Sequence, residues 1–218
     1  SWLKERGITV VHVVSSVKFA LKAQQAGVDA IVAEGFEAGG HNGRDETTTL
    51  TLIPMVRAQV NIPLIAAGGI ATGNGMMAAM ALGADGVQIG SRFVTSIESS
   101  AHAAFKNAVL LAKEGDTQLT LKELTPVRLL KNKFYQDLQL LYKSTPTEND
   151  LKTFLGKGRA KRGMFEGDLE KGELEIGQIA GLINEISSVS DIVDAVISEF
   201  NSCKTRLSTL NLNNQNDE

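Results

Sequence analysis

Three glycines surround a histidine in the stretch Glu37-Ala-Gly-Gly-His41-Asn-Gly43. Histidine titrates near neutral pH, so it can act as a base, an acid or a hydrogen-bond donor. The glycines would let the backbone lie flat against a planar ligand while the imidazole points into a site. A surface-loop histidine without a chemical role is the alternative interpretation. The pattern favours a catalytic role for His41.

Two further turns combine small residues at the ends of short apolar runs. Gly68-Gly69 follows the run 64–67, and Gly90-Ser91 follows the run 86–89. Glycine lets backbone N–H groups approach a phosphate closely, and each turn precedes a helix whose N-terminal dipole favours an anion. Tight turns with no ligand are the alternative. Two such turns at successive strand ends favour a single phosphate site.

The other histidines and the basic stretch are expected to have structural or solvent-exposed positions and no role in catalysis. His12 interrupts an apolar strand and is expected in the core or at its rim, and His102 is expected to face solvent. Three scattered histidines without matching carboxylates predict no metal site. The basic stretch 157–162 is expected to be a solvated loop; a lid that touches a phosphate is the alternative.

The surrounding sequence predicts alternating strands and helices. Nearly unbroken apolar runs are typical of strands covered on both faces, as in parallel sheets. The predicted strands are 8–14, 29–33, 64–67 and 86–89. The predicted helices between them are 17–26, 50–60 and 73–82. Repeated βα units imply an α/β fold with a parallel sheet and right-handed crossovers.

Glycines at strand ends and short turns favour a barrel over an open sheet. A closed (β/α)8 TIM-type barrel needs eight βα units in about 250 residues, whereas four are visible here. We therefore expect residues 1–95 to be the C-terminal half of such a barrel, with the other half missing or supplied by another chain. A helical extension or lid is expected at 96–205, with helices over 98–113, 126–142 and 189–200. A disordered tail is expected at 206–218.

Composition excludes several classes of protein. A formal net charge of −3 gives no reason to expect nucleic acid or an anionic membrane as a partner. The one cysteine, Cys203, rules out a disulfide framework and is typical of a reducing, cytoplasmic setting. The sequence contains no run of about 18 apolar residues, the length expected of a membrane span. The expected partners are a small-molecule substrate and a second copy or another chain that completes the barrel.

Three motifs together carry a family resemblance. They are Glu37-Ala-Gly-Gly-His41-x-Gly43, Ala66-Ala-Gly-Gly-Ile70 and Gly86-Val-Gln-Ile-Gly-Ser-Arg-Phe93. In this order and spacing they resemble the nitronate monooxygenase family, formerly the 2-nitropropane dioxygenases. The related FMN-dependent enoyl-acyl-carrier-protein reductases share them. The resemblance is strong over 8–115 and weaker beyond.

The resemblance implies a flavoprotein with FMN as cofactor and a set of site residues. It assigns the phosphate to Gly68, Gly69, Gly90 and Ser91, where Ser91 replaces the usual threonine and keeps its hydroxyl. It places Gln88 and Ile89 along the flavin, and Gly39 and Gly40 beside its ring. It makes His41 the catalytic residue. A further flavin-binding segment of the family, on the first barrel strand, has no counterpart here.

The resemblance leaves three functions open. The first is a monooxygenase that oxidises alkyl nitronates with dioxygen to carbonyl compounds and nitrite. The second is an NAD(P)H-dependent FMN enoyl-ACP reductase, which the short loop 41–49 ending in Thr47-Thr48-Thr49 favours. The third is an inactive truncated chain that acts only by pairing with another chain.

Overall fold

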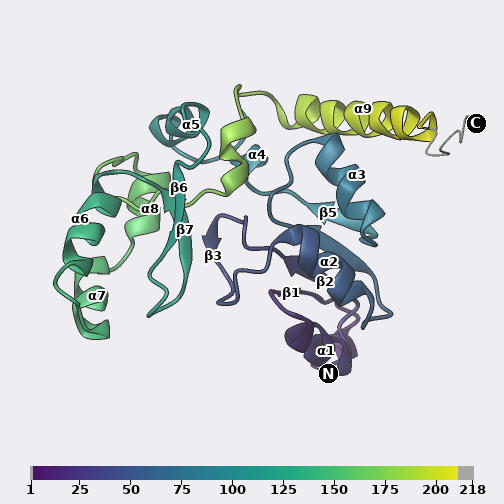
Figure 1. Cartoon of the computed structure of the whole chain (residues 1–218), viewed down its shortest axis with the longest axis horizontal. Helices are drawn as coiled ribbons and strands as arrows, with labels where there is room; N and C mark the ends of the chain where they lie inside the picture. The colour runs from purple at the N-terminus through teal and green to yellow at the C-terminus, as the bar shows by residue number, and fades with distance from the viewer. Residues whose placement is uncertain (1, 211–218) are drawn as a thin grey trace, which may run out of the picture.

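The structure is a computed structural model that describes residues 2–210. Two lobes lie side by side, one built on a parallel sheet and the other on an antiparallel sheet (Figure 1). A single 3₁₀ turn, η1 (Lys4–Arg6), precedes the first strand and ends at Gly7. Among the described residues, no helix is both long enough and apolar enough to cross a membrane.

The first lobe has four parallel strands in the order β1-β2-β4-β5. These strands are β1 (Val11–Val14), β2 (Ala30–Glu34), β4 (Leu64–Ala67) and β5 (Gly86–Gln88). The helices that connect them are α1 (Val17–Gln25), α2 (Thr49–Arg57) and α3 (Gly73–Ala81). The predicted α/β class and half-barrel sheet are confirmed, and each predicted element in this lobe lies within a few residues of its place.

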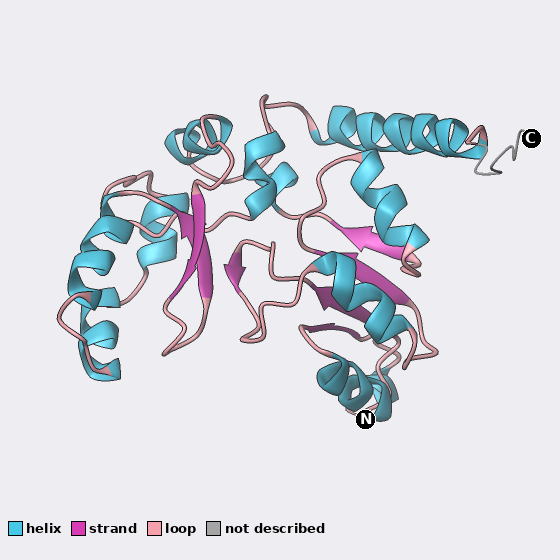
Figure 2. Cartoon of the chain, viewed as in Figure 1, coloured by secondary structure: helices cyan, strands magenta, loops and turns pink. Residues whose placement is uncertain are grey.

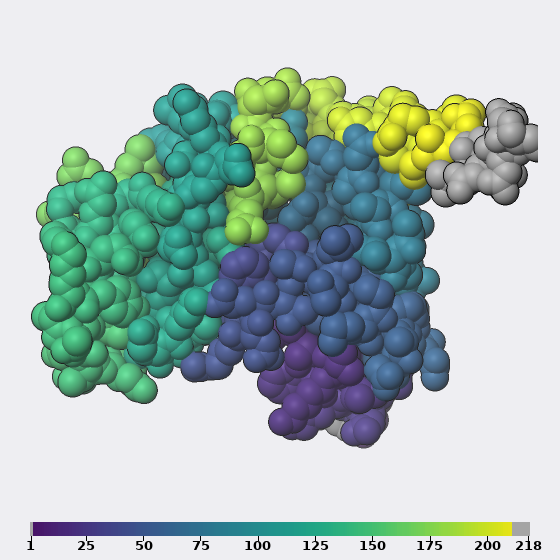
Figure 3. Space-filling model, viewed as in Figure 1, coloured from purple at the N-terminus to yellow at the C-terminus, as the bar shows by residue number. Residues whose placement is uncertain are grey.

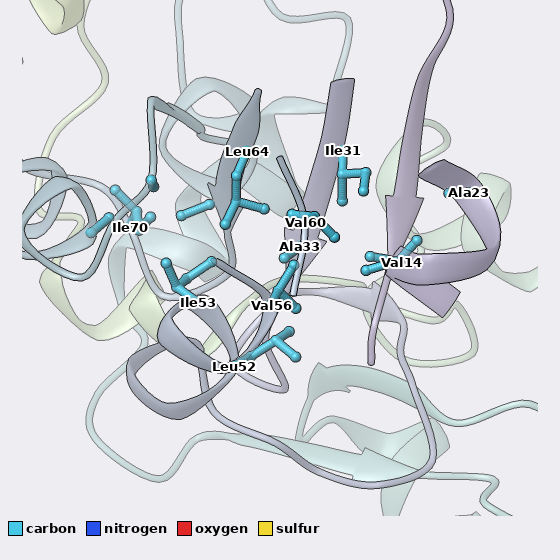
Figure 4. Packing of buried hydrophobic residues seen from close by; sticks show 14 residues of the cluster. Val14, Ala23, Ile31, Ala33, Leu52, Ile53, Val56, Val60, Leu64 and Ile70 are labelled. Atoms are coloured by element: carbon cyan, nitrogen blue, oxygen red, sulfur yellow. The ribbon is translucent and has the colours of Figure 1, made fainter. Parts of the chain in front are cut away.

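The core of this lobe lies between the sheet and its helices (Figures 2 and 4). Ile31 of β2 lies beside Leu64 of β4, and both are fully buried. Since strand side chains alternate between faces, the row Glu34, Ala67 and Gln88 faces away from this core. The side chains that face the helices hold the sheet and helices together. Burial of each fully buried aliphatic side chain contributes about 1.5–3 kcal/mol to the stability of the fold. The opposite row is left for a site.

The second lobe contains an antiparallel sheet in the order β3-β7-β6. Its strands are β3 (Gly40–His41), β6 (Thr117–Thr120) and β7 (Val127–Leu130). Its helices are α5 (Ala103–Leu110), α6 (Lys133–Tyr142), α7 (Glu148–Leu155) and α8 (Arg159–Met164). The buried Arg128 of β7 donates to the Phe36 carbonyl at 3.1 Å from Nε and 3.0 Å from Nη2. This side chain therefore fixes the start of the 36–41 loop to the second lobe.

The segment 96–205, expected to be a helical extension or lid, contains strands β6 and β7 besides its helices. The first part of the predicted helix 126–142 is instead strand β7, whose four side chains are all buried. The helix α6 starts only after Asn132, whose side chain accepts from the Tyr135 amide at 3.0 Å. That N-cap begins a helix and separates it from the strand. The predicted helix 98–113 is likewise shortened to α5.

The longest helix, α9 (Val189–Ser208), packs along α3 at the edge of the parallel sheet (Figure 1). Because α9 continues past residue 206, the disordered tail predicted for 206–218 does not begin at that residue. The helix is stabilised by the Ser188 N-cap and by burial of Ile192, Val196 and Cys203. The rest of that predicted tail, 211–218, lies outside the described residues. Two short helices complete the fold, α4 (Ser91–Val94) and η2 (Gln178–Leu182).

Candidate active site

The carboxyl ends of three parallel strands meet at one edge of the sheet. Glu34 pairs with Ala67, and Ala67 pairs with Gln88. A cavity of about 250 Å³ lies at this edge. Its lining residues are Glu34, Glu37, Ala38, Gly39, Gly40, Ala67, Gly68, Gly69, Ile70, Gln88, Gly90, Ser91, Val94, Met164, Glu175, Ile176 and Ile179. Ligands of α/β proteins commonly bind at this end of the strands.

The Gly68-Gly69 turn borders the cavity and needs both glycines. Their φ angles are +92° and +69°, which side chains rarely tolerate. A Cβ at Gly68 would lie 2.7 Å from the Gly35 carbonyl oxygen. A Cβ at Gly69 would lie 3.2 Å from the Glu37 Cβ. The Glu37 carboxylate is itself held in place, since it accepts from the Thr49 amide at 2.9 Å and the Thr49 hydroxyl at 3.0 Å.

The Gly90-Ser91 turn borders the same cavity. A Cβ at Gly90 would meet no atom within 4 Å, so its backbone faces open space. The amides of Gly90 and Ser91 donate to no described residue. The Ser91 Oγ accepts a hydrogen bond from the Gly177 amide at 3.0 Å, which leaves its own proton free to donate.

One part of the phosphate argument is wrong: the N-terminus of α3 is not open to a ligand. The Gly73 amide donates to the Glu199 carboxylate of α9 at 2.8 Å, and the Gly75 amide donates to the Thr72 hydroxyl at 3.1 Å. A carboxylate already compensates the dipole of this helix. Any anion at the cavity therefore depends on the two turns themselves.

The loop before His41 lies between the cavity and the segment 174–178. A Cβ at Gly39 would lie 2.4 Å from the Ile176 carbonyl carbon and 2.5 Å from the Gly177 nitrogen. Gly40 has a φ of +73°, and a Cβ there would lie 2.8 Å from a Glu175 carboxylate oxygen. A side chain at Gly39 would collide with backbone atoms, and the positive φ at Gly40 favours glycine there. The close approach that these glycines permit is to the segment 174–178, and the predicted approach to a planar ligand stays a prediction.

His41 lies beside the cavity but does not line it. It pairs with Val127 in the antiparallel sheet, and its side chain is exposed. Asn42 holds the loop closed, because its side-chain amide donates to the Ala38 and Gly40 carbonyls at 2.9 and 3.0 Å. The predicted catalytic residue therefore neighbours the cavity wall at Gly40.

The remaining predicted residues divide between the site, the core and the surface. Gln88 lines the cavity, whereas Ile89 packs against the hydrophobic core. His12, expected in the core or at its rim, is exposed on the edge strand β1, while His102 is exposed as expected. Within residues 2–210, no three histidine, cysteine or acidic side chains lie together as metal ligands.

Three carboxylates of the cavity were not predicted: Glu34, Glu37 and Glu175. Burial raises the pKa of Glu34 above its ordinary value. Burial also raises the pKa of Glu175, while the nearby His41 charge lowers it. Strand alternation could have identified Glu34 as a residue that faces away from the helices. Nothing in the sequence indicates Glu175, which reaches the cavity from the second lobe.

The site residues come from both lobes. The segment around residue 180, yellow-green in Figure 3, lies between the two lobes. Val94, Met164, Ile176 and Ile179 supply an apolar part of the cavity wall. Apolar walls with a few polar groups are typical of small-molecule sites.

A family model described as nitronate monooxygenase matches residues 1–199. The chain belongs to the nitronate monooxygenase family. It is 35% identical to a protein named "Probable nitronate monooxygenase" from Staphylococcus saprophyticus, over 94% of this chain and 60% of that protein. The chain thus spans about 60% of the length of this relative.

Solved structures agree with this assignment. FabK from Thermotoga maritima superposes with a TM-score of 0.89 at 43% identity, over 95% of this chain and 65% of that one. Nitroalkane oxidase from Streptomyces ansochromogenes superposes with a TM-score of 0.78 at 30% identity, over 94% and 61%. The family resemblance predicted from the three motifs is confirmed.

Proposed function

We propose that this chain forms the FMN-binding and catalytic half of an oxidoreductase that oxidises alkyl nitronates with dioxygen to carbonyl compounds and nitrite. The observation that carries the proposal is the meeting of three sequence-distant motifs around one cavity. The 37–40 loop, the Gly68-Gly69 turn and the Gly90-Ser91 turn all line it. Membership of the nitronate monooxygenase family supports the choice of reaction.

The residues present fit FMN. Because the two turns carry glycines, no side chain of Gly68, Gly69 or Gly90 obstructs the approach of a phosphate, and the amides of Gly90 and Ser91 are free to donate. Gly68, Gly69, Gly90 and Ser91 would hold the phosphate, while Gly39, Gly40 and Gln88 would lie along the flavin. Ile89 would support this wall from the core. When bound, FMN supplies the electron transfer of the reaction.

The protein's own part is to bind, orient and deprotonate. His41 would accept the proton of a neutral nitroalkane or stabilise the anionic substrate, because it lies next to Gly40 at the cavity wall. The apolar side chains Val94, Met164 and Ile179 would pack against the alkyl part of the substrate and exclude water. The buried Arg128 would keep the loop in place through the Phe36 carbonyl.

Replacing His41 tests this role. The variant His41→Ala should keep bound FMN, measured by its visible absorbance, and lose turnover of ethyl nitronate by about 100-fold. The matched control is His102→Ala, whose exposed imidazole is far along the chain and does not line the cavity. Turnover of His41→Ala close to that of the wild type would contradict the catalytic role.

Two alternatives remain testable. NADPH-dependent reduction of an enoyl thioester is the second candidate, favoured by the short loop that ends in Thr47-Thr48-Thr49. In the structure that run anchors Glu37 through Thr49. Anaerobic mixing with NADPH decides: rapid bleaching of the flavin supports a reductase, and inertness supports the monooxygenase. A yellow, monomeric species on size exclusion would exclude the third candidate, a chain active only with a partner.

A further inference from the structure

We infer that Thr49 is a positioning residue for the proposed phosphate site, because its buried hydroxyl fixes the orientation of the peptide group between Gly68 and Gly69. The inference deepens the proposed function and rests on it for the identity of the ligand. Thr49 is the first residue of α2 and the last of the run Thr47-Thr48-Thr49. It does not line the cavity, so it acts on a ligand only through its neighbours.

The Thr49 hydroxyl is buried among three acceptors. Its Oγ lies 2.9 Å from the Gly68 carbonyl oxygen, 3.0 Å from a Glu37 carboxylate oxygen and 3.2 Å from the Ala67 carbonyl oxygen. The Glu37 carboxylate also accepts from the Thr49 amide at 2.9 Å, and the Ala67 carbonyl also accepts from the Gly35 amide at 2.9 Å. The Gly68 carbonyl has no second donor among the described residues. It is therefore the acceptor that depends on the hydroxyl.

The peptide group between Gly68 and Gly69 needs such an anchor. Neither residue has a Cβ, so this peptide can turn over at little steric cost. The Gly69 amide donates to no described residue, so it does not hold the peptide in place. The Thr49 hydroxyl is the contact that selects one of the two orientations.

The orientation of this peptide decides which group the turn presents to a ligand. The carbonyl oxygen and the N–H hydrogen of a trans peptide point in opposite directions, and residues 2–210 contain no cis peptide. Because the Gly68 carbonyl is directed at Thr49, the Gly69 N–H points away from Thr49, and Gly69 lines the cavity. An N–H group attracts a phosphate, whereas the reversed peptide would present a carbonyl oxygen that repels it.

The position of the Thr49 side chain is itself fixed. A Cβ at Gly35 would lie 2.1 Å from the Thr49 Oγ and 2.4 Å from the Thr49 nitrogen, so the chain packs closely around both atoms. The Thr49 amide donates to the two Glu37 carboxylate oxygens at 2.9 and 3.1 Å. Valine has the shape of threonine and would keep these amide bonds. The effect of Thr49→Val should therefore fall on the Gly68-Gly69 turn.

Fluorescence titration of the whole chain with FMN and with riboflavin, which lacks the phosphate, tests the inference without turnover. Thr49→Val should weaken FMN by about 10-fold, as expected for one lost hydrogen bond, and leave riboflavin within about 2-fold. Thr49→Ser keeps the hydroxyl and should keep both affinities within about 3-fold. Thr120→Val is the matched control, because it removes a buried threonine hydroxyl that does not line the cavity. An unchanged ratio of the two affinities in Thr49→Val, or the same change in Thr120→Val, would overturn the inference.

Nuclear magnetic resonance of the flavin-free chain separates this inference from the proposed function. The nuclear Overhauser effect between the Gly68 Hα atoms and the Gly69 amide hydrogen reports the orientation of the peptide. It should change in Thr49→Val and be retained in Thr49→Ser. A wild-type chain that binds FMN no more tightly than riboflavin would contradict the proposed phosphate site, and the resonance measurement would still decide the role of Thr49. An unchanged effect in Thr49→Val would show that the hydroxyl does not hold the peptide.

Discussion

Gly177 and Ser91 are joined by a hydrogen bond of 3.0 Å between the Gly177 amide and the Ser91 Oγ, across the two lobes of the molecule. A Cβ at Gly177 would lie 2.9 Å from both that oxygen and the Glu37 carbonyl oxygen. The adjacent Gln178 amide donates to the same Glu37 carbonyl at 2.9 Å. One short segment thus ties the Gly90-Ser91 turn to the 37–40 loop, and the cavity depends on that connection.

Removal of the Ser91 hydroxyl should weaken cofactor binding. Ser91→Ala loses a donor to the proposed phosphate and the acceptor for the Gly177 amide, so FMN affinity should fall by about 10-fold, as expected for one hydrogen bond of about 1 kcal/mol or slightly more. Ser91→Thr should keep the affinity within about 3-fold because it retains the hydroxyl. Fluorescence titration with FMN measures both. Equal affinities for Ser91→Ala and wild type would contradict a hydroxyl contact.

Substitution of Gly68 should destabilise the whole site. Alanine at a φ of +92° costs about 1–2 kcal/mol, and its Cβ would also press on the Gly35 carbonyl at 2.7 Å. We expect the free energy of unfolding of Gly68→Ala to fall by at least about 1 kcal/mol in urea titrations. Gly86→Ala is the control, since a Cβ there meets nothing within 4 Å and its φ is not positive. A smaller loss in Gly68→Ala than in Gly86→Ala would refute the steric argument.

The sequence predicted the parallel lobe well because each of its elements is specified locally. Ser16 caps α1 and Thr72 caps α3 as their types suggest, and the strands are continuous apolar runs. The motifs placed Gly68 and Gly90 at one edge because parallel strands end together. Such information lies within a few residues of each element.

The second lobe was predicted less well because its structure depends on contacts between distant residues. Val127-Arg-Leu-Leu is compatible with a helix, and it becomes β7 only through pairing with Thr117–Thr120 and Gly40–His41. Glu175 enters the site through its bridge to Leu129, for which the sequence offers no pattern. The capping of α3 by Glu199 spans 126 residues and was equally hidden.

The contact between α3 and α9 depends on Gly73. A Cβ there would lie 2.2 Å from the Phe200 nitrogen and 2.3 Å from the Val196 carbonyl oxygen, both backbone atoms of α9. Gly73→Ala should therefore displace α9, which hydrogen exchange would register as lost protection over residues 192–203. Gly75→Ala in the same helix is the control: its Cβ would meet ordinary contacts at 3.5 Å, and the better helix former should stabilise α3 by about 0.5–1 kcal/mol. Unchanged protection of α9 in Gly73→Ala would contradict this packing.

The last prediction concerns Glu173, a buried carboxylate next to the site. Burial and the neighbouring Glu175 raise its pKa from 4.5 to about 7, while Arg159 acts in the opposite direction. Because the folded state then binds the proton more tightly than the unfolded state, this group lowers stability as pH rises from about 4.5 to about 7 and adds no further change above that.

Glu173→Gln carries no proton to lose, so its free energy of unfolding should not show this decline. Urea titrations measure the free energy of unfolding at pH 5 and at pH 8. Relative to wild type, the free energy of unfolding of the variant should be about 2 kcal/mol higher at pH 8 than at pH 5. The control is Glu170→Gln, which removes an exposed carboxylate three residues earlier. Its free energy of unfolding should change between pH 5 and pH 8 as that of the wild type does. If wild type and Glu173→Gln lose the same stability between pH 5 and pH 8, the carboxyl of Glu173 is ionised in the folded protein at both, and burial does not control its charge.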